Sequence, residues 1–319
     1  MNIRIKRMAM LKMVIKKIKK ALDEGVLIER TKQKIRNNQI IFTGLDYDIE
    51  NVYFQKKIYK KLYSTYKDDI FAYKKTNEFQ DVNKIIWTCW LQGVDNAPEI
   101  VQACINSVSQ SFYDYDYSMK VITKDNFSQY ITLPKYIIEK WEKGIITNTH
   151  FSDILRIELL YKYGGIWIDS TVFVSDNCDD MKHILNDDIF IYKQISLDNR
   201  AFSPIICSSW LIKSKSNNEV IGLTRYLLRM YWKENNYLCH YFLLHFFLTM
   251  AFRKYSDTYK HIPTFNNQSP HILSLELENE FSEKRWIEIQ KMSSFHKLSR
   301  HINYSDGNNF YNNILKGNI

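Results

Sequence analysis

Chain breakers are scarce in this sequence: its 319 residues include nine glycines and five prolines. This composition excludes a linker-rich or disordered chain, and the length allows one large domain or two closely packed lobes. The sequence also contains no Walker loop, no Gly-x-Gly-x-x-Gly fingerprint and no recognisable Ser/His/Asp arrangement. The usual signatures of P-loop enzymes, dinucleotide-binding enzymes and serine hydrolases are therefore missing.

Cysteine is also sparse, with five widely spaced residues and no Cys-x-x-Cys pair. An odd number at such spacings argues against a disulfide framework or a zinc knuckle, and it favours a reducing, cytoplasmic compartment. Long hydrophobic runs are lacking as well. The nearly all-apolar stretch at residues 241–252 is shorter than the roughly 20 residues that a membrane-spanning helix needs, so we expect a core helix there.

The basic excess is confined to the amino terminus. Residues 1–36 hold twelve basic and three acidic residues, which account for the formal net charge of +9 and leave the remainder neutral. A nucleic-acid-binding protein would carry its charge on the fold itself, so we expect no nucleic acid partner. Apolar residues recur in this segment at spacings of three and four, with lysines turned away from them, at Met8, Leu11, Ile15, Ile18 and Leu22.

This pattern predicts a basic amphipathic helix. One interpretation is that residues 1–22 bind an anionic membrane surface, which would make the protein peripheral on the inner face of the plasma membrane. The other interpretation is that the apolar stripe packs against the body of the protein. No small-residue cleavage site follows the segment, so we expect no signal peptide.

Downstream of this segment, apolar runs alternate with helical patterns. Strands are predicted at residues 83–90, 119–123, 166–168, 188–192 and 205–212, and helices at 98–110, 134–143, 153–163 and 217–255. Strands that alternate with helices indicate an α/β fold with a mainly parallel sheet. We divide the chain into the basic segment 1–36, a helical preamble 37–80, an α/β core 81–215 and a mostly helical region 216–319.

The most informative segment is residues 150–171. A helix is predicted at 153–163, with Ser152 as its candidate N-cap. Gly164 and Gly165 stop this helix, because glycine adopts the left-handed conformation that helix ends often need. A continuous apolar strand follows and ends at Asp169. Ligands of open α/β sheets bind at the carboxyl ends of strands, so Asp169 is either a site residue or a turn-forming aspartate.

Asp153 and Arg156 lie three residues apart and share a face of this helix. Two interpretations are open. The pair forms an ordinary intrahelical ion pair, or it recognises a sugar, with the carboxylate accepting from hydroxyl groups and the guanidinium binding a hydroxyl or phosphate oxygen. The apolar surroundings and the closeness to Asp169 favour sugar recognition.

Two blocks of the sequence resemble glycosyltransferase family 32, and within it the branch of bacterial capsular polysaccharide synthesis. The first block contains Ser152, Asp153 and Arg156, followed by Gly-Gly-Ile-Trp-Ile-Asp at residues 164–169. The second is Lys-Ile-Ile-Trp-Thr-Cys-Trp-Leu-Gln-Gly at residues 84–93, followed by Pro98, and a weaker match lies at residues 295–299.

The resemblance implies a GT-A-like nucleotide-sugar-binding sheet flanked by helices. It also implies a hexosyltransferase that moves a hexose, with retention, from a UDP-linked donor to a lipid-linked capsular or cell-surface polysaccharide intermediate. The catalytic residues implied are Asp153, Arg156 and Asp169, and those implied to bind the nucleotide sugar are Trp90, Gln92, Gly165 and Thr171. For Trp90 the role is stacking on the base, with a plain core position as the alternative; Trp87 is expected in the core.

The family also implies a divalent cation, Mn²⁺ or Mg²⁺, which would neutralise the leaving diphosphate. Asp169 is its expected ligand. Thr171 stands where many members carry the second Asp of a DXD triplet and offers only a hydroxyl, so His296, or else His271, is the candidate for a further ligand. This departure leaves a rival open: a non-catalytic, membrane-associated polysaccharide assembly protein with a degenerate donor site.

Overall fold

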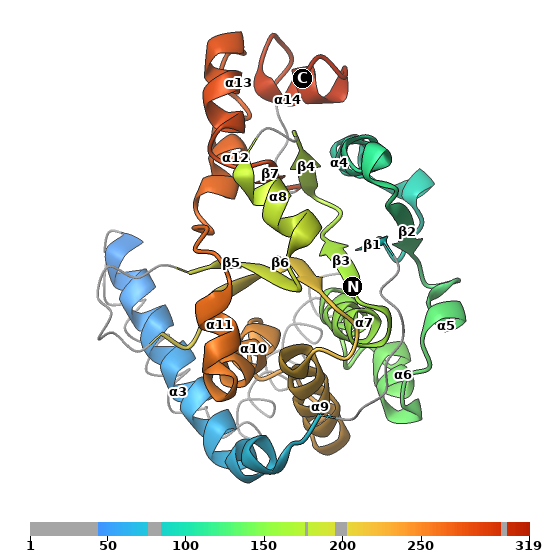
Figure 1. Cartoon of the computed structure of the whole chain (residues 1–319), viewed down its shortest axis with the longest axis vertical. Helices are drawn as coiled ribbons and strands as arrows, with labels where there is room; N and C mark the ends of the chain where they lie inside the picture. Colours follow the sequence, from blue (N-terminus) through green and yellow to red (C-terminus); the bar gives the residue numbers. More distant parts are fainter. Residues whose placement is uncertain (1–43, 76–83, 176–177, 195–202, 301–304) are drawn as a thin grey trace, which may run out of the picture.

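The computed structural model describes residues 44–75, 84–175, 178–194, 203–300 and 305–319, with the backbone alone for 44–51. The predicted amphipathic helix at the amino terminus lies outside these residues. A five-stranded sheet of order β2-β1-β3-β6-β5 occupies the centre of the described fold (Figure 1). Its strands are β1 (Ile85–Cys89), β2 (Ser118–Ile122), β3 (Gly165–Ile168), β5 (Ile189–Lys193) and β6 (Cys207–Ser214).

Strand directions agree with the prediction of a mainly parallel sheet. β1 pairs in parallel with β2 and with β3, whereas β6 runs antiparallel to both β3 and β5. Within this sheet, as far as the described residues show, β6 alone runs against the others. The α/β class with helices on both faces, which the sequence predicted, is confirmed.

Alternating side chains of β1 and β3 point into two different hydrophobic cores. Trp87 and Trp167 point into the larger one, which is covered by α3 (Gly44–Ala72), α7 (Asn148–Tyr163), α9 (Glu219–Glu234) and α10 (Leu243–Lys254). Ile86 and Ile166 point to the opposite face, against α4 (Glu99–Ser111) and α8 (Asp179–Asn186). Figure 1 shows helices on either side of the strands. The two-residue period of a strand thus explains why β1 and β3, whose two faces are both covered, consist almost entirely of apolar residues.

A second, two-stranded sheet completes the fold beside α4. β4 (Val172–Val174) pairs antiparallel with β7 (Phe295–Lys297), although more than 120 residues separate them in the chain. The shorter elements around both sheets are α5 (Phe127–Tyr130), α6 (Lys135–Glu142), α11 (Ser256–His261), α12 (Ile272–Glu276), α13 (Glu283–Gln290), α14 (Phe310–Leu315) and the 3-10 turns η1 (Val94–Asn96), η2 (Tyr113–Tyr115) and η3 (Ser269–His271).

The helix that precedes β3 begins earlier than the sequence predicted. α7 starts at Asn148, and the side chain of Thr147 caps it by accepting a hydrogen bond from the backbone N–H of His150. The prediction of Ser152 as the cap is therefore wrong: Ser152 lies inside the helix, because residues 148–151 already have helical geometry. The predicted two-glycine stop is present, with φ of +68° at Gly164 and +92° at Gly165.

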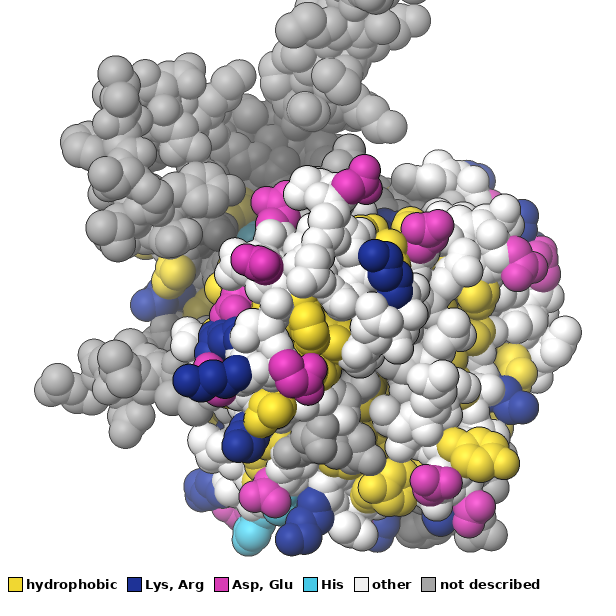
Figure 2. All heavy atoms as spheres, turned by 90° about the horizontal axis from the view of Figure 1, so that it is seen from above, with side chains coloured by type: hydrophobic (Ala, Val, Ile, Leu, Met, Phe, Trp, Pro, Cys, Tyr) yellow, Lys and Arg dark blue, Asp and Glu magenta, His cyan; other side chains and the backbone are white. Residues whose placement is uncertain are grey.

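The long helix α3 lies within the predicted preamble and packs on α10. Its buried side chains recur at helical spacing, at Ile58, Tyr59, Leu62, Tyr66 and Ile70. Within the part of the chain that is described, no helix combines the length and apolar character needed to cross a membrane. On the face seen in Figure 2, acidic and basic side chains are interspersed.

Candidate active site

A cavity of about 320 Å³ opens where β1 and β3 end, at the edge of the sheet where the sequence predicted a ligand site. Larger cavities lie elsewhere, such as one of about 360 Å³ beside α4 and α13, but none of the predicted site residues lines it. The residues that line the first cavity include Trp90, Gln92, Arg156, Asp169, Thr171, Lys297 and Arg300. We call it the β-edge cavity.

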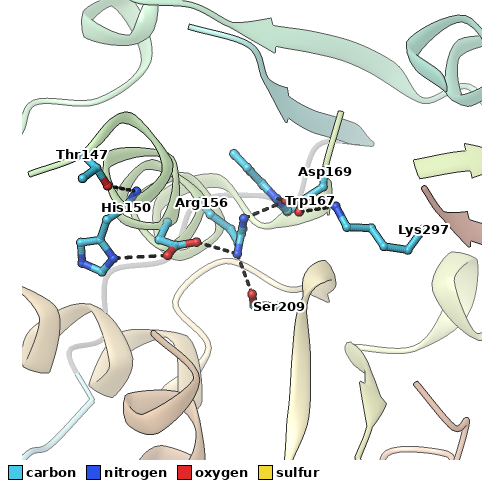
Figure 3. A network of polar contacts seen from close by, with 8 residues as sticks. Thr147, His150, Arg156, Trp167, Asp169, Ser209 and Lys297 are labelled. Atoms are coloured by element: carbon cyan, nitrogen blue, oxygen red, sulfur yellow. Dashed lines mark hydrogen bonds and ion pairs between the residues drawn. The ribbon is translucent and has the colours of Figure 1, made fainter. Parts of the chain in front are cut away.

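Asp169 lies in the wall of the β-edge cavity, directly after β3, and both oxygens of its carboxylate are engaged (Figure 3). Oδ1 accepts from Nη2 of Arg156 and from Nε1 of Trp167, each at 2.8 Å, and Oδ2 accepts from Nζ of Lys297 at 3.0 Å. Burial raises the pKa of the carboxyl, but the charges of Lys297 and Arg156 outweigh this effect and hold the pKa below its ordinary value. Asp169 is thus a carboxylate that organises two cations.

Arg156 is the centre of this polar network. Its side chain is only 5% exposed, and its guanidinium lies 4.8 Å from the ring centre of Trp167. Nη1 donates to Oγ of Ser209 at 2.9 Å and lies 3.0 Å from Oδ1 of Asp153. A buried guanidinium needs partners for its charge and its N–H groups, and here two carboxylates and a hydroxyl contact Nη1 and Nη2, whereas Nε has no hydrogen-bond partner among the described residues.

Asp153 holds Arg156 from behind rather than reaching the cavity. Its carboxylate bridges Arg156 and His150, whose Nδ1 lies 3.3 Å from Oδ2, and it is not among the residues that line the wall. In Figure 3 this chain of contacts runs from His150 across to Lys297. The structure therefore brings Asp153, Arg156 and Asp169 into one network, but it places only the latter two at the cavity.

Lys297 is a site residue that the sequence reasoning missed. The pairing of Val172 with Lys297 across β4 and β7 carries its side chain to the turn after β3. There Nζ donates to Oγ1 of Thr171 at 2.6 Å as well as to Asp169. The weak match at residues 295–299 was the available signal, but it directed attention to the neighbouring histidine.

His296 points away from the β-edge cavity because successive residues of a strand face opposite sides. Its imidazole is fully buried, with Nε2 2.9 Å from Oγ of Ser175, and burial lowers its pKa to about 4. The structure does not bring His296 to Asp169. The prediction that these two residues bind the same metal ion is therefore corrected: His296 is a buried residue of the core. His271 packs its ring against Trp210 and does not line the cavity either.

Trp90 and Gln92 both line the cavity, at the end of β1. The guanidinium of Arg300, another missed residue, lies 4.8 Å from the ring centre of Trp90 and so already stacks on the indole. Trp87 is a core residue as predicted, 1% exposed, with Nε1 donating to the carbonyl of Gly164.

Gly165 lies at the opposite end of β3 from Asp169, outside the cavity lining. A Cβ there would come within 2.4 Å of the carbonyl oxygen of Ile85 on β1. The glycine therefore permits β1 and β3 to approach each other closely. The predicted contact of Gly165 with the nucleotide sugar is corrected: this residue serves the packing of the two strands.

The side chains present do not fit a resident divalent cation. Both oxygens of Asp169 and the hydroxyl of Thr171 already accept from cationic or indole N–H groups. Among the residues that the structure describes, no group of three or more His, Cys, Asp or Glu side chains is arranged to hold a metal ion. Mg²⁺ and Mn²⁺ need several oxygen ligands with free lone pairs. The predicted Mn²⁺ or Mg²⁺ stays a prediction.

Comparison with known proteins assigns the family. The model of the capsular polysaccharide synthesis protein family matches residues 12–315, so the chain belongs to that family. Over 123 residues it is 28% identical to the O-glycosyltransferase braB of Annulohypoxylon truncatum, a match that covers 36% of this chain and 29% of that protein. It also resembles the solved structure of PaToxG glycosyltransferase with a TM-score of 0.36 and 14% identity, over 75% of this chain and 95% of the other. The narrower assignment to glycosyltransferase family 32 stays a prediction.

Proposed function

We propose that this protein is a glycosyltransferase that moves a hexose from a UDP-linked donor to a lipid-linked intermediate of capsular or cell-surface polysaccharide. Its membership of the capsular polysaccharide synthesis family and its partial similarity to an O-glycosyltransferase support the transferase class. This proposal includes four expectations that come from the sequence resemblance alone: the UDP-linked donor, the hexose, the lipid-linked acceptor and the retaining course of the reaction.

The observation that carries the proposal is the charge of the β-edge cavity. Among the residues that the structure describes, three cationic side chains line it, Arg156, Lys297 and Arg300, against a single carboxylate, Asp169. A nucleoside diphosphate carries its charge on the diphosphate group, and arginine and lysine are the residues that bind such groups. The cavity volume of about 320 Å³ lies at the lower end of the range for small-molecule sites.

Catalysis in this proposal depends on fixed positive charge. As the bond between the sugar and the diphosphate breaks, negative charge grows on the departing phosphate oxygen, and donors held in place stabilise it without reorganising. Arg156 is held in this way by Asp153, Asp169 and Ser209. Asp169 itself acts through the two cations that it orients.

Binding of UDP provides the first test. A ligand at a hundred times its Kd stabilises the folded protein by about 2.7 kcal/mol, so saturating UDP should raise the thermal unfolding midpoint measurably. Release of free sugar from a panel of nucleotide sugars then identifies the donor. Binding without any turnover of the panel, with or without an acceptor lipid, would favour the non-catalytic assembly protein; no binding of any nucleoside diphosphate would refute the donor site.

The membrane partner is a separate part of the proposal, because residues 1–22 lie outside the described structure. We expect the intact 319-residue chain to bind vesicles that contain anionic lipid, with about 1 kcal/mol from each basic residue near the surface. A variant lacking residues 1–22 should keep donor hydrolysis but lose vesicle binding. Equal binding by both forms would place the membrane contact elsewhere.

A further inference from the structure

We propose that the ammonium group of Lys297 takes the place predicted for a divalent ion and neutralises the departing nucleoside diphosphate. This inference rests on the proposed function and deepens it, since it names the group that supplies the charge. It makes the chemical step independent of a metal ion.

The first support is position. Nζ of Lys297 lies 3.0 Å from Oδ2 of Asp169 and 2.6 Å from Oγ1 of Thr171, the two positions that correspond to the DXD triplet. A bound cation would take those same two oxygens as ligands. The ammonium therefore lies where an ion bound to Asp169 and to the second position of a DXD triplet would lie.

The second support is that Lys297 can still serve a ligand. An ammonium group has three N–H donors, and the bonds to Asp169 and Thr171 use two of them. Its side chain is 20% exposed and lines the β-edge cavity. Lys297 therefore presents positive charge to the cavity while two oxygens hold it in place.

The third support is the charge that a metal ion would meet. An ion bound to Oδ2 of Asp169 would sit about 2 Å from that oxygen, close to the ammonium, and would be repelled by it. Oδ1 is taken by Arg156 and Trp167. Metal binding would thus require Lys297 to leave both of its partners.

The transfer step balances without a metal ion. The bond between the anomeric carbon and the β-phosphate oxygen breaks, and its electron pair stays on that oxygen. The hydroxyl oxygen of the acceptor bonds to the anomeric carbon, and the hydroxyl proton is released to water. Lys297 donates a hydrogen bond to the diphosphate and retains its own proton, so it stabilises the charge that develops.

The experiment measures UDP binding and donor hydrolysis by the full chain in EDTA and in Mn²⁺. For the wild type we expect the same Kd for UDP and the same turnover, within about twofold, in both conditions. Lys297→Ala should weaken UDP binding by about 10- to 100-fold in EDTA, as expected for a charged hydrogen bond, and lower kcat by about 100-fold or more.

Two controls make the result specific. Lys284→Ala removes an exposed lysine of α13 outside the cavity and should change neither quantity. Lys297→Arg keeps the charge and should recover part of the affinity, which a purely structural role in β7 would not explain. Circular dichroism and the unfolding midpoint establish that each variant is folded.

The outcomes separate the inference from the proposed function. Wild-type binding or turnover that falls at least tenfold in EDTA and returns with Mn²⁺ would overturn the role of Lys297 while leaving a glycosyltransferase. This comparison needs no variant, so it holds even if Lys297→Ala fails to fold. A wild type that binds neither UDP nor GDP in either condition would overturn the proposed function and this inference together.

Discussion

Replacing Gly165 by alanine tests how closely β1 and β3 must approach. The residue has φ of +92°, a conformation that residues with a Cβ rarely adopt, and the new methyl group would lie 2.4 Å from the carbonyl oxygen of Ile85. A side-chain rotation cannot relieve this contact, because the methyl group of alanine is fixed to the backbone and the oxygen of Ile85 belongs to the backbone. The parallel pairing of Ile86 with Ile166 lies immediately beside this contact, so we expect the two strands to separate locally.

The cost has two parts of known size. A left-handed conformation costs a residue with a Cβ about 1–2 kcal/mol. Forcing an extra methyl group into a packed region adds about 1–3 kcal/mol. We therefore expect Gly165→Ala to lower the free energy of unfolding by about 2–5 kcal/mol, a large part of the roughly 5–15 kcal/mol that a native protein has.

Gly144→Ala is the matched control, because Gly144 has φ of +66° but no atom lies within 4 Å of the place that a new methyl group would take. It should cost about 1–2 kcal/mol, from the backbone conformation alone. Urea unfolding of both variants, followed by tryptophan fluorescence, gives the two free energies. If they agree within about 0.5 kcal/mol, the close contact with Ile85 does not limit the fold and the reasoning is refuted.

Three further measurements follow from the same structure. Burial lowers the pKa of both His245 and His296 to about 4, below the ordinary 6.5, so between these two pH values the two imidazoles take up protons only in the unfolded chain. The free energy of unfolding should therefore fall as pH decreases from 6.5 toward 4, by about 1.4 kcal/mol per pH unit for each histidine, and His296→Gln should flatten this slope. Asp153→Asn removes one of two carboxylates from the buried Arg156, so we expect a loss of about 1–3 kcal/mol in unfolding free energy together with weaker UDP binding; unchanged UDP affinity would contradict the supporting role of Asp153. Thr147→Ala removes the cap of α7 and should cost about 1 kcal/mol in urea unfolding, whereas Thr147→Ser should cost little.

Local patterns predicted the central part of the site well. The helix, the glycine stop, the apolar strand and Asp169 are neighbours in the chain, so their arrangement follows from backbone geometry over some twenty residues. The position of Trp90 and Gln92 also followed, because both strands end at the same edge of a parallel sheet. In these cases local sequence and tertiary structure agree.

The partners of Asp169 could not be found in this way. Lys297 lies 128 residues further along and belongs to a strand of three residues, which is too short for a two-residue period to show. Neighbouring residues of a strand face opposite sides, so the prediction that His296 lies at the site implied that Lys297 faces away from it. The role of Gly165 was predicted wrongly for another reason. A glycine in a strand indicates that something approaches the backbone closely, but the sequence does not distinguish a neighbouring strand from a ligand.

The pairing of β4 with β7 has a consequence for the order in which the protein is made. The five-stranded sheet needs no residue beyond Ser214, yet the β-edge cavity lacks its lysine until residue 297 has been synthesised. At roughly 5–20 residues per second, the ribosome needs on the order of ten seconds to pass from Asp169 to Lys297. From the synthesis of Ser214 onward a nascent chain has all five strands of the central sheet, but it lacks the second cation at Asp169 until Lys297 has been made. Donor binding at the proposed site should therefore begin only after β7 has been synthesised, and a chain truncated before β7 should keep much of its secondary structure without binding the donor.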